Sequence, residues 1–322
     1  MIALRETHSV AWFEGTASRR HRNPKVWQLL GEAVPAAIRV HKSFRDAPVF
    51  AQFVGFPRSG HSLVGALIDA HPDAAISHEL DVMGLFHKGV PMPLIHGLIA
   101  KTVEDFADAG RYWNGFSYTV SGAHESIPTR PFVIGDKKGD GTVRHCAARP
   151  DLLQKVSMRL GNRARWILVT RNPFDNIATM SLRKGRDYDR LRIETDDGQF
   201  WTAVRTAQAD GRIAAEVLDD IIDDYADLCR AANGMQAQIS AAQWHQVVYE
   251  DFTTSVRFEC QRLLAFLGLT SAKAYLSAAN NLVRPAGVPS RDRIEWRKDQ
   301  VQRVENLIAE ISFLSPYQQS IR

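Results

Sequence analysis

The feature that most constrains this 322-residue sequence is an apolar run that leads through a glycine-containing loop into a helical pattern. Residues 48–56 read PVFAQFVGF, which is typical of a strand buried in a parallel sheet. In the next segment, Leu63, Leu67 and Ala70 have helical spacing, and Pro72 marks the end of the helix. Such a junction directs backbone N–H groups at one point, and the helix dipole adds about half a positive charge there. The junction therefore predicts an anion-binding loop.

The rest of the chain repeats this alternation of strand and helix. Apolar segments predict further strands at 131–136, 165–170 and 244–251, with helical patterns between them. We therefore expect an α/β fold of three layers, with a central parallel sheet flanked by helices. We assign residues 47–322 to this one domain.

Residues 1–46 are predicted to form an N-terminal extension packed on the main domain. Within it, the pattern over 26–41 indicates a short helix that is interrupted at Pro35. Residues 18–25 are a basic run, which is expected to be an exposed arm or to contact a membrane or a polyanion.

Composition limits the classes of protein that the chain can belong to. Hydrophobic residues make up 45% and charged residues 24%, as in an ordinary globular enzyme. The net charge is only +4, and no basic stripe with interleaved aromatic residues indicates a nucleic-acid partner. Three widely spaced cysteines favour reduced thiols. We find neither a secretory segment nor an apolar stretch long enough to cross a bilayer, so we expect a cytoplasmic protein without a transmembrane segment.

The loop departs from the usual phosphate-binding loop of nucleoside triphosphatases. The glycine spacing in 55–62 matches that loop, but His61 occupies the lysine position and the cation is Arg58 instead. A histidine is largely uncharged at neutral pH, and no apolar strand ends in the acidic pair expected of a magnesium site. These departures indicate a ligand without a γ-phosphate. The alternative is a tight turn in which Pro57 and Gly60 serve only geometry.

The run PRSGHSLVGALIDAHP (57–72) resembles the 5′-phosphosulfate-binding loop of sulfotransferases that use 3′-phosphoadenosine-5′-phosphosulfate (PAPS). It is most similar to the Pro-Arg-Ser-Gly-Thr-Thr-Leu form of tyrosylprotein sulfotransferases and many bacterial relatives. His61-Ser62 replaces Thr-Thr and keeps one hydroxyl. The resemblance implies a P-loop-like fold, PAPS as donor, adenosine 3′,5′-bisphosphate (PAP) as product and no metal. The loop residues that it implies for the donor are Arg58, Ser59, Gly60, His61, Ser62 and Leu63.

A second segment, ILVTRNPFDNIATMSLR, resembles the 3′-phosphate-binding element of the same family. Arg171 follows a predicted strand, at the edge where open α/β sheets bind ligands, and can grip a phosphate through two parallel hydrogen bonds. Thr179 stands eight residues later, where the family usually has serine, and Ser181 is the alternative hydroxyl. The structural alternative is a surface pair of Arg171 with Asp175.

Two further segments resemble the family's catalytic positions. VIGDKKG (133–139) aligns Lys137 with the lysine that approaches the bridging oxygen of the donor, and Lys138 is the alternative by one register step. AAISHELDV (74–82) places Glu79 where tyrosylprotein and heparan-type enzymes have a glutamate base, with His78 and Asp81 as alternatives. The Lys-Thr-His segment that supplies the base in cytosolic sulfotransferases is absent from this sequence. The catalytic residues that the resemblance implies are Glu79, Lys137 and Arg58.

The C-terminal part carries weaker similarities. Residues 249–269 resemble a structural segment of the family, and Arg291 in PSRDRIEWRKDQ aligns with a loop that closes over the nucleotide. Trp296 is expected to pack rather than to stack on adenine. The histidines form no metal-binding motif.

Together these resemblances imply a sulfotransferase that moves a sulfuryl group to a hydroxyl or amine by in-line displacement, with Glu79 as general base. The expected partner is a small-molecule or carbohydrate acceptor. The aromatic residues of 106–122 are expected to line its site or to form the core of a lid. The alternatives are a P-loop kinase or nucleotide hydrolase, and a non-catalytic nucleotide-binding protein.

Overall fold

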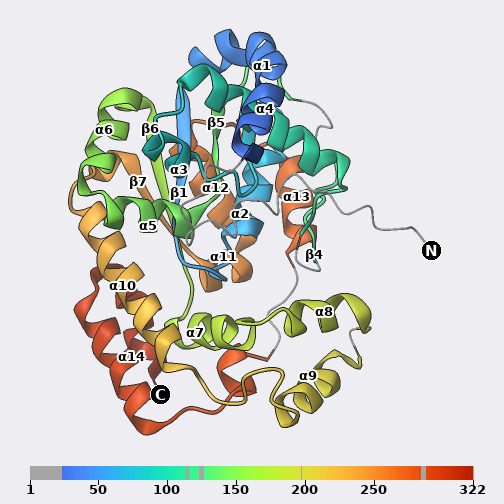
Figure 1. The fold of residues 1–322 in the computed structure, drawn as a ribbon, viewed down its shortest axis with the longest axis vertical. Coiled ribbons are helices and arrows are strands. Elements are labelled where there is room, and N and C mark those ends of the chain that lie inside the picture. The colour runs from blue at the N-terminus through green and yellow to red at the C-terminus, as the bar shows by residue number, and fades with distance from the viewer. Residues whose placement is uncertain (1–23, 114–115, 123–126, 197, 284–287, 322) are drawn as a thin grey trace.

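A five-stranded parallel sheet forms the centre of the protein (Figure 1), with the strand order β2-β5-β1-β6-β7. The structure is a computed structural model that describes residues 24–113, 116–122, 127–196, 198–283 and 288–321. The strands of the sheet are β1 (Val49–Gly55), β2 (Ala74–Ser77), β5 (Val133–Asp136), β6 (Ala164–Thr170) and β7 (Trp244–Val248). An antiparallel pair, β3 (Tyr112–Trp113) and β4 (Phe116–Ser117), stands apart from this sheet.

Helices that come before, between and after the strands in the chain cover both faces of the sheet (Figure 1). They are α1 (Pro24–Arg45), α2 (His61–Asp69), α3 (Val82–His87), α4 (Met92–Asp108), α5 (Gly139–Ala148), α6 (Pro150–Leu160), α7 (Pro173–Leu182), α8 (Asp187–Glu194), α9 (Phe200–Ala209), α10 (Asp219–Gln236), α11 (Tyr249–Thr254), α12 (Val256–Leu267), α13 (Lys273–Leu282) and α14 (Lys298–Glu310). Short 3₁₀ segments occur at Gly161–Arg163, Ala241–Gln243, Ser290–Arg293 and Ser312–Ile321.

Alternate residues of β1 enter two separate hydrophobic cores. Phe50 and Val54 pack into the core that includes α5, α10 and α14. Ala51 and Phe53 pack into the core on the other face, which includes α2, α12 and α13. Successive side chains of a strand point to opposite faces, so a strand with helices on both faces is apolar at almost every position. The expected three-layer α/β fold is confirmed.

Helix α1 corrects the prediction that Pro35 interrupts the N-terminal helix. The helix runs from Pro24 to Arg45 with Pro35 inside it. Pro35 is exposed, as is Gly31, whose carbonyl loses its hydrogen-bond partner, while Ala33 and Ala37 are buried against α4. The contact is close, because a Cβ at Gly97 of α4 would lie 2.3 Å from the Ala33 carbonyl oxygen. Packing along this face offsets the roughly 3 kcal/mol that a proline costs inside a helix.

The predicted strand at 244–251 is also too long. Strand β7 ends at Val248, and α11 begins at Tyr249. Glu250 and Asp251 lie in the first turn of α11, where the helix dipole favours acidic side chains. The turn into the helix brings the Tyr249 ring against the loop that follows β1.

The topology brings the predicted site segments to one edge of the sheet. Parallel strands end at a common edge, and the neighbours β5, β1 and β6 are followed by Lys137, the predicted anion-binding loop and Arg171 respectively. Strand β2, at the side of β5, is followed by Glu79. Within the described residues, none of the helices combines the length and apolar character that crossing a membrane requires.

Candidate active site

The loop between β1 and α2 is shaped by two residues in the left-handed conformation. Gly60 caps α2 with φ 95°, and a Cβ there would lie 2.3 Å from the Tyr249 ring, so only glycine fits. Arg58 has φ 67°, which is uncommon for a residue with a side chain. The first N–H groups of α2 therefore face the end of this loop, as the sequence predicts for an anion site.

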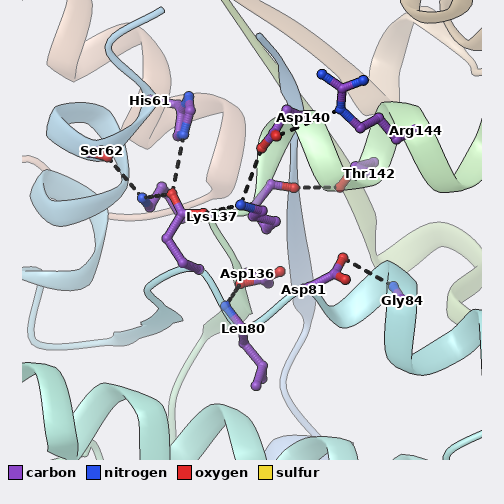
Figure 2. Close-up of polar contacts among 12 residues, drawn as sticks. His61, Ser62, Leu80, Asp81, Gly84, Asp136, Lys137, Asp140, Thr142 and Arg144 are labelled. Atoms are coloured by element: carbon purple, nitrogen blue, oxygen red, sulfur yellow. Dashed lines mark hydrogen bonds and ion pairs between the residues drawn. The ribbon is translucent and has the colours of Figure 1, made fainter. Parts of the chain in front are cut away.

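Lys137 is the centre of a buried polar cluster beside this loop (Figure 2). Its side chain is only 1% exposed. Its ammonium group donates to Ser62 Oγ at 2.9 Å, lies 3.2 Å from His78 Nε2 and pairs with Glu79 Oε1. Gly65 makes room for the lysine chain, because a Cβ at that position would lie 2.4 Å from Lys137 Cγ. The structure thus brings together the predicted acid-base and lysine residues.

Glu79 is held by three nitrogen-bearing side chains. Lys138 Nζ lies 2.8 Å from Oε2, while Lys137 Nζ and His61 Nε2 (3.4 Å) both contact Oε1. Burial opposes ionisation of the carboxyl group. The charge of Lys137, the hydrogen bond from His61 and the charge of Lys138 nevertheless lower the pKa of Glu79 well below its ordinary value. Burial in turn lowers the pKa of Lys137, and Glu79 opposes that shift.

The backbone around Glu79 is strained, and hydrogen bonds to Asp136 hold it in place. Glu79 and Asp81 both have positive φ angles, 64° and 66°. The buried carboxylate of Asp136 accepts the N–H groups of Leu80 at 3.1 Å and Val82 at 2.9 Å, and Ser77 Oγ at 2.9 Å. Burial raises the pKa of Asp136 to about 6, against the effect of these hydrogen bonds. Strain of this kind persists where the surroundings fix it, and it is common in functional sites.

The other residues considered for the base have structural partners. The His78 ring stacks on Phe106 with centroids 4.0 Å apart and meets Trp113 edge-on at 5.2 Å. Burial, followed by the charge of Lys137, lowers the pKa of His78 well below its ordinary value. Asp81 caps α3 through Gly84 N at 3.2 Å and pairs with His145 Nε2 at 2.9 Å.

Arg171 forms a second cluster on the other side of the loop. Its Nη1 donates to Thr179 Oγ1 at 3.0 Å and to the Arg58 carbonyl at 3.3 Å. Its Nη2 donates to Ser290 Oγ at 3.2 Å, and the guanidinium lies 5.6 Å from the Tyr249 ring centroid. Across the ranges that the structure covers, no carboxylate pairs with Arg171. The cluster therefore combines a cation with two hydroxyls. Burial raises the pKa of the nearby Glu250, and the charge of Arg171 opposes that shift.

Two alternatives that the sequence left open have separate roles here. Asp175, the alternative partner of Arg171, instead accepts the Arg291 N–H at 2.9 Å and lies 3.8 Å from the Arg291 guanidinium. Ser181, the alternative hydroxyl, accepts the N–H of Leu218 at 3.3 Å. Of the two candidate hydroxyls, that of Thr179 therefore contacts Arg171.

The remaining predicted residues lie around these clusters. Arg58 faces α8, where Asp189 lies 3.6 Å from its guanidinium. Ser59 is fully buried and its hydroxyl lies 3.3 Å from His61 Nδ1. Leu63 packs against the core that contains α2. Trp296 meets Phe174 edge-on at 5.2 Å, in agreement with the packing role expected for it.

Three residues of the site were not predicted from the sequence. Ser290 lies in the segment PSRDRIEWRKDQ, where the resemblance pointed to Arg291 instead, and its contact with Arg171 spans 119 positions. Tyr249 begins a segment that was interpreted as structural. Gly65 carried a usable signal, because a glycine inside a helical pattern often marks a close approach, here that of Lys137. Among the described residues, no group of three or more histidine, cysteine or acidic side chains is arranged to hold a metal ion.

Comparisons with known proteins place these observations in context. No protein-family profile and no curated protein matches the chain. Among solved structures, a sulfotransferase domain from the curacin biosynthetic pathway is 13% identical over 76% of this chain and 81% of its own, with a TM-score of 0.38. A sulfotransferase from Mycobacterium avium is 12% identical over 91% and 84%, with a TM-score of 0.40. A mouse sulfotransferase complexed with PAP is 12% identical over 85% and 87%, with a TM-score of 0.38.

Proposed function

We propose that this protein is a sulfotransferase that moves a sulfuryl group from PAPS to a hydroxyl or amine of an acceptor. The observation that carries the proposal is that two groups of cationic and hydrogen-bonding residues lie at one edge of the sheet. One is the loop at the N-terminus of α2 with Lys137 beside it, and the other is Arg171 with its two hydroxyls. A donor with a 3′-phosphate and a 5′-phosphosulfate has one anionic group for each site.

The residues divide between these two groups of the donor. The N–H groups at the start of α2 and the hydroxyl of Ser62 would hold the phosphosulfate, with Arg58 at the loop. Arg171, Thr179 and Ser290 would hold the 3′-phosphate, which suits a guanidinium and two hydroxyl donors. Arg291, next to Ser290 in the chain, is the further phosphate contact that the motif implies.

The transfer is an in-line displacement at sulfur. The acceptor oxygen or nitrogen bonds to sulfur as the bond between sulfur and the bridging oxygen breaks, so PAP leaves with the electron pair of that bond. Lys137 would stabilise the negative charge that grows on the departing oxygen. Glu79 would take the proton of the acceptor, a role worth roughly 10²–10⁴-fold in rate.

Glu79 becomes a competent base only if its ion pairs are rearranged. A carboxylate paired with Lys137 and Lys138 holds a proton weakly, since its pKa is well below the ordinary value. Donor binding offers Lys137 a second anion, the phosphosulfate, and a shift of the ammonium toward it weakens the ion pair with Glu79. The buried carboxylate then binds a proton more readily. In this mechanism, donor binding prepares the base.

Aromatic side chains border the cluster on the acceptor side. Trp113 and Tyr118 contact the ring of His78, which itself contacts Lys137. Burial raises the pKa of Tyr118 to about 12, so its phenol remains a hydrogen-bond donor. Such a wall suits the flat face of a sugar or an aromatic ring. We therefore propose a small-molecule or carbohydrate acceptor.

A ligand comparison tests the proposed function. Thermal unfolding of the purified protein is measured with PAP, with adenosine 5′-phosphate and with ATP plus magnesium. PAP is expected to stabilise the protein most, because it alone carries the 3′-phosphate that would bind Arg171. Adenosine 5′-phosphate lacks that 3′-phosphate. Greater stabilisation by ATP plus magnesium would instead favour a kinase or nucleotide hydrolase. Acceptors are then screened with labelled PAPS, and a protein that binds PAP but transfers nothing would be a non-catalytic nucleotide-binding protein.

A further inference from the structure

The imidazole of His61 bridges the anion-binding loop and Glu79 (Figure 2). His61 is the first residue of α2 and is only 6% exposed. Its Nε2 lies 3.4 Å from Glu79 Oε1, and its Nδ1 lies 3.3 Å from the hydroxyl of Ser59. The side chain at the position of the missing lysine is thus directed at the proposed base.

Hydrogen-bond chemistry fixes the state of this ring. Glu79 is ionised, so its oxygens can only accept, and Nε2 must carry the hydrogen. Nδ1 then accepts from the Ser59 hydroxyl. Burial, together with the charge of Lys137, lowers the pKa of His61, although the hydrogen bond to Glu79 opposes the shift. Both nitrogens of the neutral ring are therefore engaged, and neither is available to take a proton from an acceptor.

The distribution of contacts between the two carboxylate oxygens of Glu79 suggests a role for the His61 contact. Oε2 contacts Lys138, whereas Oε1 contacts both Lys137 and His61. In the proposed mechanism Lys137 moves toward the donor, and Oε1 loses a partner when the carboxylate must accept a proton. His61 remains on that oxygen. A threonine, which the related loops carry at this position, is too short to make the contact.

We propose that His61 is a positioning residue that holds the Glu79 carboxylate in place for proton transfer, a role that rests on the proposed function. It acts through Glu79 and does not contact the reacting atoms. Because the contact is made by the side chain and the loop amides belong to the backbone, the role is separable from donor binding.

Two substitutions separate the two ends of the imidazole. His61→Gln places an amide N–H near the position of Nε2 and keeps a donor for Glu79. His61→Asn places its polar atoms near Nδ1, so it retains the side toward Ser59 and loses Glu79. For His61→Asn we expect kcat to fall roughly 10- to 100-fold, as for a displaced catalytic group, with the KM for PAPS and the Kd for PAP within about two-fold of wild type. His61→Gln is expected to recover most of the lost kcat.

His71 supplies a matched control. It is 3% exposed, its Nε2 donates to the Thr270 carbonyl at 3.0 Å, and its Nδ1 accepts the Asp73 N–H at 3.1 Å. It is thus a buried histidine of the same tautomer outside the site. His71→Asn and His71→Gln are expected to lower the melting temperature without a selective loss of kcat.

Turnover of all the variants is measured as release of PAP from PAPS. The assay uses an acceptor from the screen, or water as the acceptor.

The outcomes separate this inference from the proposed function. Wild-type protein that neither binds PAP nor releases it from PAPS contradicts the function. Equal losses of kcat in both His61 variants, or losses confined to KM and Kd, contradict the positioning role and indicate a purely structural ring or a donor contact. ¹⁵N NMR of labelled histidine determines the tautomer of His61, and hence its hydrogen bond to Glu79, without an activity assay. An Nδ1–H tautomer for His61 would overturn the proposal.

Discussion

The loop after β1 lies between two charged clusters whose cations have different kinds of partner. On the β5 side, Lys137 and Lys138 share the carboxylate of Glu79, and Lys138 also lies 3.5 Å from Asp140. On the β6 side, Arg171 contacts two hydroxyls and a carbonyl. In the first cluster the two lysines pair directly with carboxylates, whereas Arg171 in the second forms no direct ion pair with any described residue.

This difference separates binding from chemistry. An arginine already oriented by Thr179 and Ser290 can receive a phosphate with little rearrangement, so this cluster should contribute mainly to affinity. The ion pairs of Glu79 must be exchanged when an anion enters, and exchange changes the pKa of the groups involved. The first cluster should therefore contribute mainly to turnover.

Substitution of Glu79 should have the largest effect. Glu79→Gln keeps the shape of the side chain but removes its ability to accept a proton as a carboxylate. We expect kcat to fall roughly 10²–10⁴-fold, with the Kd for PAP near that of wild type. Release of PAP from PAPS and calorimetric titration with PAP measure the two quantities.

Two controls guard this result. Because Lys137 is buried and loses a charged partner in Glu79→Gln, the melting temperature must show that the variant is folded. His78→Ala removes the neighbouring ring, which we expect to affect kcat far less. Near-normal turnover in Glu79→Gln, combined with collapse in His78→Ala, would transfer the role of base to the histidine.

Arg171→Ala should produce the next largest effect, on PAP affinity instead of kcat. Removal of a charge-assisted contact should weaken PAP binding by roughly 1.5–3 kcal/mol, while kcat at saturating PAPS changes little. Arg291 provides the comparison, because its guanidinium is a third exposed and already lies near Asp175. Arg291→Ala is expected to weaken PAP binding less. A variant of Arg171 that melts early without a selective loss of PAP affinity would make Arg171 a structural residue.

The sequence revealed those parts of the site that depend on neighbours in the chain. Strand, loop and helix follow one another within residues 48–72, so local periodicity and one glycine were enough to predict the junction of strand, loop and helix. Arg171 and Thr179 are eight residues apart, and the helical pattern between them was visible. The parallel sheet then brings the ends of its strands together, which is why segments far apart in the chain were correctly expected at one edge.

Contacts between distant segments could not be predicted in this way. The bond between Ser290 and Arg171 and the clamp of Asp136 on the Glu79 loop depend on the packed fold. The continuity of α1 through Pro35 likewise follows from its contact with α4, which outweighs the local preference to end a helix. Both candidate lysines, Lys137 and Lys138, pair with the carboxylate of Glu79, a contact that the sequence pattern did not indicate.

The smallest predicted effect tests whether pH acts on the first cluster through Asp136. The pKa of Asp136 is raised to about 6 by burial, above the ordinary value of 3.8. The folded protein therefore binds this proton more readily than the unfolded chain does. The stabilisation is fully present below the unfolded pKa and is lost as pH rises through about 6.

Asp136→Asn removes this titration and retains one acceptor for the loop. The free energy of unfolding of wild type minus that of the variant should increase by about 1 kcal/mol when the pH falls from 7 to 5, because most of the proton is taken up in that interval. Glu79 stays ionised there, since its pKa lies well below the ordinary value, and shared histidines largely cancel in the difference. Urea unfolding at each pH gives the comparison. PAP affinity, which depends on the Arg171 cluster, should not follow this trend. A difference that stays flat would mean that the hydrogen bonds from Leu80 and Val82 keep Asp136 ionised throughout.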